Sequence, residues 1–470
     1  MGLNFSASAG VFDWISGFIN LEKGQKPKSF RIDRMETLLE LAERPDKCAP
    51  SIHIAGSKGK GSVTAMIAAI LTAAGFRAGR YMSPHVIDIR ERICLGNSYF
   101  DEDIYIKAGE ELRSLMEEKL PAEVKSNPGA ASLFDAASPD GCEPTYWELL
   151  TILFFLCARE AKCGAMVVET GMGGRLDSTN VLDPLVSVIT LIELEHTAFL
   201  GNTIAAVAGE KAGIIKNNRP LILAKQCEEA LNVFKEKAKE KNCQLHYMPD
   251  TAGISGLEIN GQGTNFTLSL KNSFYIPHLE VFIPIPGRVF AQNAAIAAAA
   301  VKTAFPGIGA DEIKTGLANL KIPARFEKIA PRISGQGKPQ ETFIIDGAHT
   351  PESLELCIET FCSLYKEGGI LLFGCAADKD ANSMAKIAAC RFAKIIITVP
   401  GTFKKSDPVR VYEAFVKYAG REKTELIRDT KEAVKKARDL CLEKKLPVLG
   451  TGSFYLVSEI RKHLIQISSS

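Results

Sequence analysis

The residues best placed to do chemistry form a glycine-rich loop at positions 55–62. The loop reads Ala-Gly-Ser-Lys-Gly-Lys-Gly-Ser, after an apolar run at 51–54 and before a helical pattern at 63–74. A strand, a glycine-rich turn and a helix start make a phosphate cradle, because glycines admit the anion and the helix start offers free N–H groups. Lys60 can reach a terminal phosphate, and Ser62 can help to hold its magnesium ion. The predicted ATP-binding residues of the loop are Gly56, Ser57, Lys58, Gly59, Lys60, Gly61 and Ser62.

The spacing of this loop departs from the common phosphate-loop pattern. Only two residues separate Gly56 from Gly59, whereas the common pattern has four between its first glycine and the Gly-Lys pair. The alternative interpretation is a flexible turn with two exposed lysines. The strand before the loop and the helix after it favour the nucleotide-binding interpretation.

Two further groups of polar residues follow predicted strands. The apolar run at 165–168 ends in Glu169, and the run at 186–192 is followed by Glu195 and His196. Carboxyl ends of parallel strands face the ligand crevice of such sheets, and a carboxylate oxygen there suits magnesium. A lone histidine is more often structural than a ligand. After a phosphate loop and a strand-end glutamate, however, His196 is predicted to lie over the same crevice.

Composition indicates a globular protein of two domains. The 470 residues are too many for one ordinary core, and the hydrophobic fraction of 46% and charged fraction of 24% are typical of soluble proteins. A net charge of +2 implies no strong attraction to nucleic acid or membranes. No signal peptide or membrane span is recognised. The twelve cysteines are scattered and contain no Cys-x-x-Cys pair, so we expect buried, reduced thiols and a cytoplasmic protein.

The order of segments predicts an α/β fold. Helical patterns at 149–159 and 204–214 alternate with the strands of the first half, and residues 254–285 favour hairpins. Residues 120–144 are predicted to form a surface insertion. An alanine-rich helix at 288–303 precedes renewed alternation, with strands at 343–345, 370–373, 394–399 and 447–449. We therefore predict a catalytic domain at 1–305 and a smaller α/β domain at 306–470.

Taken in order, these motifs resemble the folylpolyglutamate synthases and dihydrofolate synthases of the Mur ligase superfamily. The resemblance covers nearly the whole chain. In the first half it rests on the glycine-rich loop, Ser83-Pro84-His85, the block 169–180, Glu195-His196-Thr197 and Glu210-Lys211-Ala212-Gly213. In the second half it rests on Asp346-Gly347-Ala348-His349, Asp378-Lys379-Asp380 and Thr451-Gly452-Ser453. Glu195 departs from the family's pattern, which has aspartate at that position.

The resemblance implies a P-loop-containing Mur-ligase-like central domain, a Rossmann-like C-terminal domain and an ATP-dependent amide ligase. ATP would phosphorylate a carboxylate of folate or dihydropteroate, and the amine of L-glutamate would attack the acyl phosphate. Lys60, His196 and Lys211 would be catalytic, and Lys211 would carry a carbamate. By position in the family, magnesium would be held by Ser83, Glu169 and His196, and ATP also by Asn293, Arg325 and Asp346. Glutamate would bind at His349 and Ser453.

The pterin end is matched by two segments, in which aromatic rings can stack on a flat ligand. These segments contain Thr145, Tyr146, Trp147, Glu148, Leu176, Asp177 and Ser178. Tyr146 and Trp147 could equally be a helix start with a hydrophobic contact. We expect a bifunctional, monomeric enzyme. Another Mur-type ligase acting on a cell-wall or polymer substrate, or a nucleotide-binding regulatory protein without turnover, remains an alternative.

Overall fold

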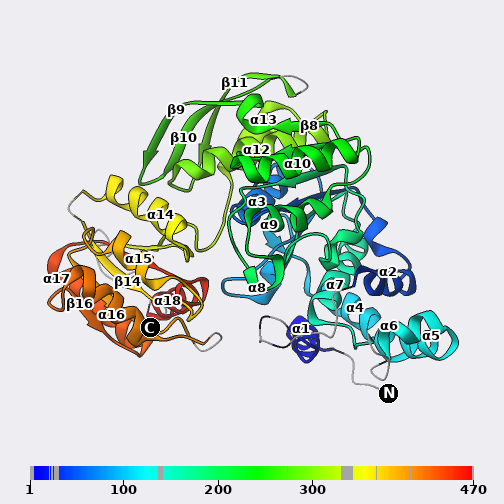
Figure 1. Ribbon diagram of the computed structural model, residues 1–470, viewed down its shortest axis with the longest axis horizontal. Helices are drawn as coiled ribbons and strands as arrows, with labels where there is room; N and C mark the ends of the chain where they lie inside the picture. The colour runs from blue at the N-terminus through cyan, green and yellow to red at the C-terminus, as the bar shows by residue number, and fades with distance from the viewer. Residues whose placement is uncertain are drawn as a thin grey trace.

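The chain folds into two α/β domains. A computed structural model describes all residues except 1–4, 21, 23–24, 26–30, 136–140, 272–273, 330–341, 367, 402–404 and 468–470. The first domain is the blue to green part of Figure 1, and the second is the yellow to red part at its left. The predicted α/β class is confirmed.

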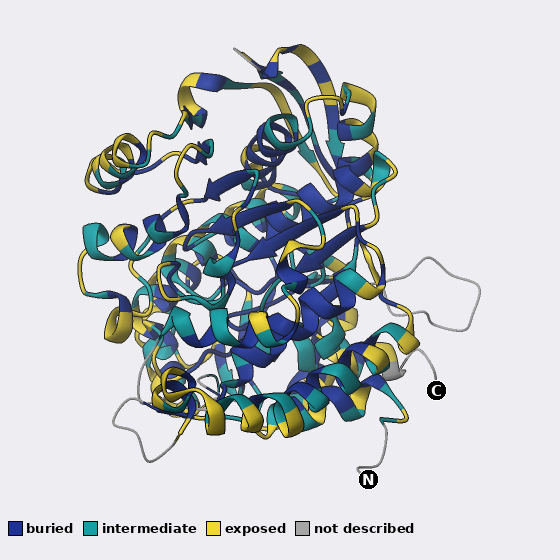
Figure 2. Cartoon of the chain, turned by 90° about the vertical axis from the view of Figure 1, so that its right-hand side faces the viewer, coloured by how far each residue is buried: buried dark blue, intermediate teal, exposed yellow. Residues whose placement is uncertain are grey.

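An eight-stranded sheet forms the centre of the first domain, in the order β4-β3-β2-β5-β1-β6-β7-β8. Neighbouring strands are parallel except where β3 pairs with β2 and with β4. The central strands are buried on both faces, as Figure 2 shows. Their bounds are β1 Ser51–Ala55, β2 Ala78–Tyr81, β3 Ile93–Leu95, β4 Ser98–Tyr99, β5 Ala165–Glu169, β6 Val186–Ile189, β7 Leu221–Leu223 and β8 Leu245–Tyr247.

Helices cover both faces of this sheet, and β5 shows how its residues divide between them. Val167 belongs to the core on the side of α3 and α12, whereas Met166 and Val168 pack on the side of α7. Continuous apolar runs therefore suit these strands. The helices are α1 Ser8–Ser16, α2 Ile32–Leu41, α3 Lys60–Ala73, α4 Glu102–Ser114, α7 Tyr146–Glu160, α8 Thr197–Leu200, α9 Ile204–Lys211, α10 Glu228–Glu240, α11 Met248–Thr251 and α12 Arg288–Ala304.

The predicted hairpin region is a separate antiparallel sheet in the order β11-β10-β9, made of β9 Ala252–Asn260, β10 Gly263–Leu270 and β11 Ile276–Ile283. Helix α13 (Ala310–Ala318) packs against β11 and α3, so it lies with the first domain. The backbone of Gly316 comes so close to Ile70 of α3 that an added Cβ would lie 2.5 Å from its Cα. We therefore propose a domain boundary after α13, later in the chain than the predicted position near 305.

The second domain contains a six-stranded sheet in the order β12-β13-β17-β14-β15-β16, parallel except for β12. Its strands are β12 Glu327–Ile329, β13 Phe343–Ile345, β14 Ile370–Phe373, β15 Lys394–Ile397, β16 Thr424–Leu426 and β17 Val448–Thr451. Its helices are α14 Pro351–Leu364, α15 Ala381–Ala388, α16 Pro408–Ala419, α17 Thr430–Lys444 and α18 Phe454–Ile467. An exposed ion pair between Arg288 of α12 and Glu359 of α14 links the two domains at 3.2 Å.

The described part of the predicted insertion at 120–144 contains two short helices, α5 Leu120–Ser126 and α6 Pro128–Phe134, with mostly exposed or half-buried residues. The twelve cysteines are all free, but only seven are buried, so the prediction of buried thiols is wrong for Cys48, Cys227 and Cys390, which are exposed, and for the half-buried Cys243 and Cys362. Across the described residues, we find no helix whose length and hydropathy would let it cross a membrane.

Candidate active site

The glycine-rich loop connects β1 to α3, as predicted, and its glycines are required by close neighbours. Gly56 has φ +148°, and a Cβ there would lie 1.8 Å from Oγ1 of Thr190. Gly59 caps α3 with φ +91°, and a Cβ there would meet Oδ1 of Asn293 at 3.0 Å. The predicted ATP residue Asn293 therefore lies beside the loop. The first N–H groups of α3 have no intrahelical acceptor and are available to an anion.

The loop is tied to the segment that follows β6. The backbone N–H groups of Ser57 and Lys58 donate to the carbonyl oxygen of Leu191 at 2.8 and 3.1 Å. The Ser57 hydroxyl donates to the carbonyl oxygen of Glu193, whose carboxylate lies 4.0 Å from Nζ of Lys58. These contacts fix the loop against the strand end that leads to His196. The backbone N–H groups of Ser57 and Lys58, two predicted ATP-binding residues, thus already have an acceptor within the protein.

Two lysine amines converge on the carbonyl oxygen of Gly56. Nζ of Lys60 donates to it at 2.9 Å and Nζ of the buried Lys211 at 2.8 Å. The two nitrogens therefore lie within about 6 Å of each other and repel. Nζ of Lys211 also donates to Oε1 of Glu195 at 2.6 Å. The arrangement concentrates positive charge where the phosphate groups of a nucleotide would bind.

The electrostatics of this cluster follow from burial and mutual contact. Burial and the charge of Lys60 lower the pKa of Lys211 to about 8, although Glu195 opposes the shift. Burial alone would raise the pKa of Glu195, but Lys60 and Lys211 lower it to about 2. The pair is therefore an ammonium and a carboxylate at neutral pH, with roughly a tenth of Lys211 in the neutral form at pH 7.

Glu169 lies at the carboxyl end of β5, next to the start of α3. Its Oε2 accepts a hydrogen bond from the backbone N–H of Ser83 at 3.3 Å and lies 3.5 Å from where a Cβ on Gly61 would stand. Burial raises the pKa of Glu169 to about 7, against the charge of Lys60. Two of the three predicted metal ligands, Ser83 and Glu169, are thus neighbours.

The third predicted ligand, His196, caps α8 in a left-handed conformation with φ +47°. The residue as a whole is exposed, but burial of the imidazole lowers the pKa of His196; Glu195 opposes this shift, and the charges of Lys60 and Lys211 add to it. Among the described residues, no group of three or more His, Cys, Asp and Glu side chains has the geometry of a metal site. A magnesium site at Ser83, Glu169 and His196 therefore stays a prediction.

The predicted pterin residues Thr145 and Glu148 make a helix cap. The Thr145 hydroxyl accepts from the backbone N–H of Glu148 at 3.3 Å, and Oε2 of Glu148 accepts from the backbone N–H of Thr145 at 2.7 Å. The same Oε2 accepts from the buried guanidinium of Arg34 at 2.7 Å. The side chains of Thr145 and Glu148 therefore form hydrogen bonds at the start of α7, and these bonds hold the turn that contains Tyr146 and Trp147.

The other predicted pterin residues lie around Gly171. A Cβ on Gly171 would lie 3.3 Å from Oδ2 of Asp177 and 3.8 Å from the Trp147 ring. The guanidinium of Arg92 stands 5.1 Å from the centre of that ring. Leu176 is exposed, and Tyr146 is buried against the Trp147 ring. Trp147 and Asp177 therefore lie on either side of Gly171, with Leu176 and Ser178 next to Asp177 in the chain.

Arg92 was not anticipated from the sequence. It is 2% exposed; its Nε donates to Nδ1 of His85 at 2.8 Å and its Nη2 to Glu22 at 3.0 Å. Burial and the charge of Arg92 lower the pKa of His85 to about 4, so the ring is neutral and can accept this bond. No local pattern marks Arg92, because its contacts with Glu22 and the Trp147 ring join segments that are distant in sequence.

In the second domain, three predicted residues gather around the ring of Phe454. The Arg325 guanidinium lies 4.7 Å from its centre and the His349 ring 5.8 Å, and Ser453 precedes it in the chain. Burial and the charge of Lys58 lower the pKa of His349 to about 3. Lys58 belongs to the phosphate loop, so its charge acts on His349 across the two domains.

In this structure both carboxylate oxygens of Asp346 accept hydrogen bonds from the protein backbone. Its Oδ2 accepts from the backbone N–H of Phe326 at 2.8 Å and its Oδ1 from that of Ala348 at 2.8 Å. Ala324 and Phe326 both have positive φ, 56° and 44°, so the segment that presents Arg325 is strained. Asp346 thereby fixes the direction of Arg325.

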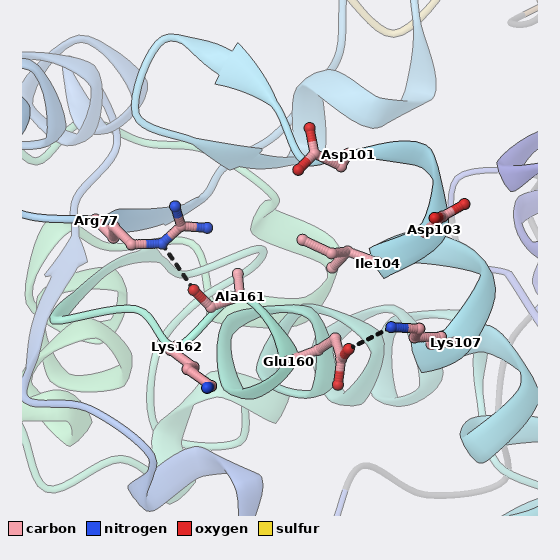
Figure 3. A pocket seen from close by; sticks show the side chains of 8 residues that line it. All are labelled: Arg77, Asp101, Asp103, Ile104, Lys107, Glu160, Ala161 and Lys162. Carbon is pink, nitrogen blue, oxygen red and sulfur yellow. Dashed lines mark hydrogen bonds and ion pairs between the residues drawn. The ribbon is translucent and has the colours of Figure 1, made fainter.

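A surface pocket of about 520 Å³ lies elsewhere on the first domain (Figure 3). Arg77 precedes β2 and Lys162 precedes β5, so the pocket is at the amino ends of these strands, opposite to the phosphate loop. Its charged residues already interact, as Lys107 does with Glu160 at 2.9 Å. We therefore do not assign the active site to this pocket.

Comparison with known proteins agrees with this geometry. The Mur ligase middle domain matches residues 135–301, and the Mur ligase glutamate ligase domain matches residues 325–454. Folylpolyglutamate synthase of Lacticaseibacillus casei is 30% identical over 439 residues, which cover 92% of this chain and 94% of that protein. Dihydrofolate synthase/folylpolyglutamate synthase of Bacillus subtilis is 29% identical, covering 98% and 100%.

Solved structures give the same result. The apo form of the L. casei folylpolyglutamate synthase superposes with a TM-score of 0.80 at 26% identity and covers 98% of this chain and 100% of that one. A folylpolyglutamate synthase complex with AMPPCP and folate has a TM-score of 0.79 at 27% identity, with coverage of 98% and 100%. The predicted two-domain Mur-ligase-like architecture is confirmed.

Proposed function

Because the chain belongs to the folylpolyglutamate synthase and dihydrofolate synthase family, we propose that it is an ATP-dependent ligase that adds L-glutamate to folates. The observation that carries the proposal is the phosphate loop with two lysine amines on Gly56 and the buried Glu169 beside it. Phosphoryl transfer needs mainly positioning and neutralised charge, which these residues supply. The γ-phosphoryl group would pass to a substrate carboxylate, and the glutamate amine would then displace phosphate.

The residues present fit a magnesium ion. A carboxylate as buried as that of Glu169 is costly without a cation, and its raised pKa reflects this cost. The hydroxyl of Ser83, the Glu169 carboxylate and the His196 ring would hold the ion. When bound, magnesium would neutralise charge on the phosphates.

We further propose that Lys211 is carbamylated in the active enzyme. Its depressed pKa leaves a neutral fraction, and that amine can add to CO2 to give a carbamate with loss of one proton. The carbamate would be an anion close to Glu195, so their present contact of 2.6 Å must break. The freed carboxylate and the carbamate could then both serve as hard oxygen ligands.

The substrate residues divide between the domains. Trp147, Leu176 and Asp177 would receive the pterin end, and His349 and Ser453 the incoming glutamate. Dihydropteroate is proposed as a second acceptor, as the name of the B. subtilis relative suggests. We propose that the protein acts in the cytoplasm as a monomer.

The test is ADP release by the purified protein with tetrahydrofolate, dihydropteroate or neither, each with and without glutamate. Release that requires both acceptor and glutamate supports the proposal, and the products identify the acceptor. Release with a cell-wall precursor instead would favour another Mur-type ligase. ATP binding without turnover on any acceptor would favour a regulatory protein.

A further inference from the structure

A buried group of three hydroxyls lies behind the proposed pterin site. Oγ1 of Thr151 on α7 lies 3.2 Å from the Tyr81 hydroxyl on β2 and 2.7 Å from Oγ of Ser178 in the loop after β5. It also donates to the carbonyl oxygen of Trp147 at 2.7 Å. Thr151 is 0% exposed and Tyr81 is 2% exposed.

The number of protons fixes the direction of these hydrogen bonds. Thr151 has one hydroxyl proton and uses it toward the Trp147 carbonyl, which can only accept. The Tyr81 hydroxyl therefore donates to Thr151, and the Ser178 hydroxyl donates to Thr151 and also reaches the carbonyl oxygen of Trp147 at 3.5 Å. Burial raises the pKa of Tyr81, so its proton is retained. The Ser178 proton is thus directed into the protein, away from any ligand.

The three hydroxyls of Thr151, Tyr81 and Ser178 connect the two segments that would bind the pterin. Trp147 is held through its carbonyl by Thr151, and its ring lies under Arg92. Ser178 follows Asp177, whose Oδ2 accepts from the backbone N–H of Met172 at 2.9 Å. Because Trp147 and Asp177 both lie next to Gly171, a small displacement between α7 and the Ser178 loop would change the space between them.

We propose that Thr151 and Tyr81 are positioning residues for the pterin end of the acceptor, and that Ser178 acts on acceptor selection through Thr151 rather than by touching the ligand. This inference rests on the proposed function and identifies what sets the shape of its acceptor site. A Ser178→Ala change would leave a buried acceptor of Thr151 unpaired and would release the loop from α7. Thr151→Val keeps the shape of the side chain but removes its hydrogen bonds with Tyr81 and Ser178, and leaves Ser178 only the longer contact with the Trp147 carbonyl oxygen at 3.5 Å.

The experiment is a double-mutant cycle in the full-length protein. Thr151→Val and Ser178→Ala should each raise KM for the acceptor by about fivefold to twentyfold, with KM for ATP unchanged. The acceptor KM of the double variant should not exceed that of the more affected single variant, because both substitutions remove the same hydrogen bond between Thr151 and Ser178. Tyr81→Phe should shift the acceptor KM in the same direction, by less. The control is Thr303→Val on α12, which removes a similar bond to a carbonyl oxygen, that of Ala299 at 2.8 Å.

Thermal melting of every variant distinguishes repositioning from unfolding. An unchanged acceptor KM in folded Thr151→Val would overturn the inference, as would multiplication of the two single effects in the double variant. An equal rise in the KM values for acceptor and ATP would also overturn it, since that indicates a general structural effect. If the wild-type protein itself turns over no folate or dihydropteroate, the proposed function fails instead.

Discussion

Replacing Lys60 by alanine is expected to lower turnover by about a thousandfold while the protein stays folded. The Lys60 amine lies at the phosphate loop, 2.9 Å from the carbonyl oxygen of Gly56. Loss of one donor aimed at developing charge costs on the order of 10²–10³ in rate, or about 3–4 kcal/mol of activation free energy. The fold should persist because Gly56 keeps its hydrogen bond from Lys211 at 2.8 Å.

The assay is ADP formation at saturating ATP, acceptor and glutamate, with circular dichroism to verify folding. Lys58→Ala is the matched control from the same loop. Its amine lies 4.0 Å from Oε2 of Glu193 in a partly exposed ion pair, so its loss should cost about tenfold or less. The assignment of Lys60 to the phosphates would be refuted if folded Lys60→Ala retained turnover within tenfold of the wild type.

Four further outcomes are expected. Lys211→Ala should lose activity and regain part of it with added short carboxylic acids; no rescue, together with no ¹³C carbamate signal from labelled bicarbonate, would contradict the carbamate. Gly56→Ala should abolish ATP binding in calorimetry, because the new Cβ would lie 1.8 Å from Thr190; wild-type affinity would contradict the loop geometry. Arg325→Ala should raise KM for ATP about tenfold, and an unchanged KM would exclude Arg325 from the nucleotide site. Burial lowers the pKa of His53 to about 3, so its unfolded state binds a proton first on acidification. In urea unfolding, this residue should make the free energy of unfolding about 2 kcal/mol lower at pH 5 than at pH 8. The variant His53→Gln should lose this part of the pH dependence.

The residues whose roles follow from local order were predictable from the sequence. A glycine-rich loop between a strand and a helix, and a glutamate at the end of the neighbouring strand, meet in space because parallel strands share an edge. The long helices were also predictable, since α7 and α12 have the length and composition that burial requires. The predicted strand at 186–192 ends at Ile189, because the chain then turns to bond the phosphate loop.

Other features depend on contacts between distant segments. The Thr145-x-x-Glu148 spacing is typical of a helix cap, but nothing near it in sequence indicates that Arg34 also bonds the Glu148 carboxylate. The contact of Ser178 with Thr151 could not be predicted either, because Thr151 lies on another element. The place of α13 beside α3 reflects the lack of a side chain at Gly316, which no periodic pattern reveals.

The central claim is tested most directly by measuring ADP release and glutamate incorporation together, using tetrahydrofolate, ATP and radiolabelled glutamate. The account predicts one labelled amide bond for each ADP released, and no release when either the acceptor or glutamate is omitted. ADP release that does not depend on glutamate, with no label in the folate, would contradict it.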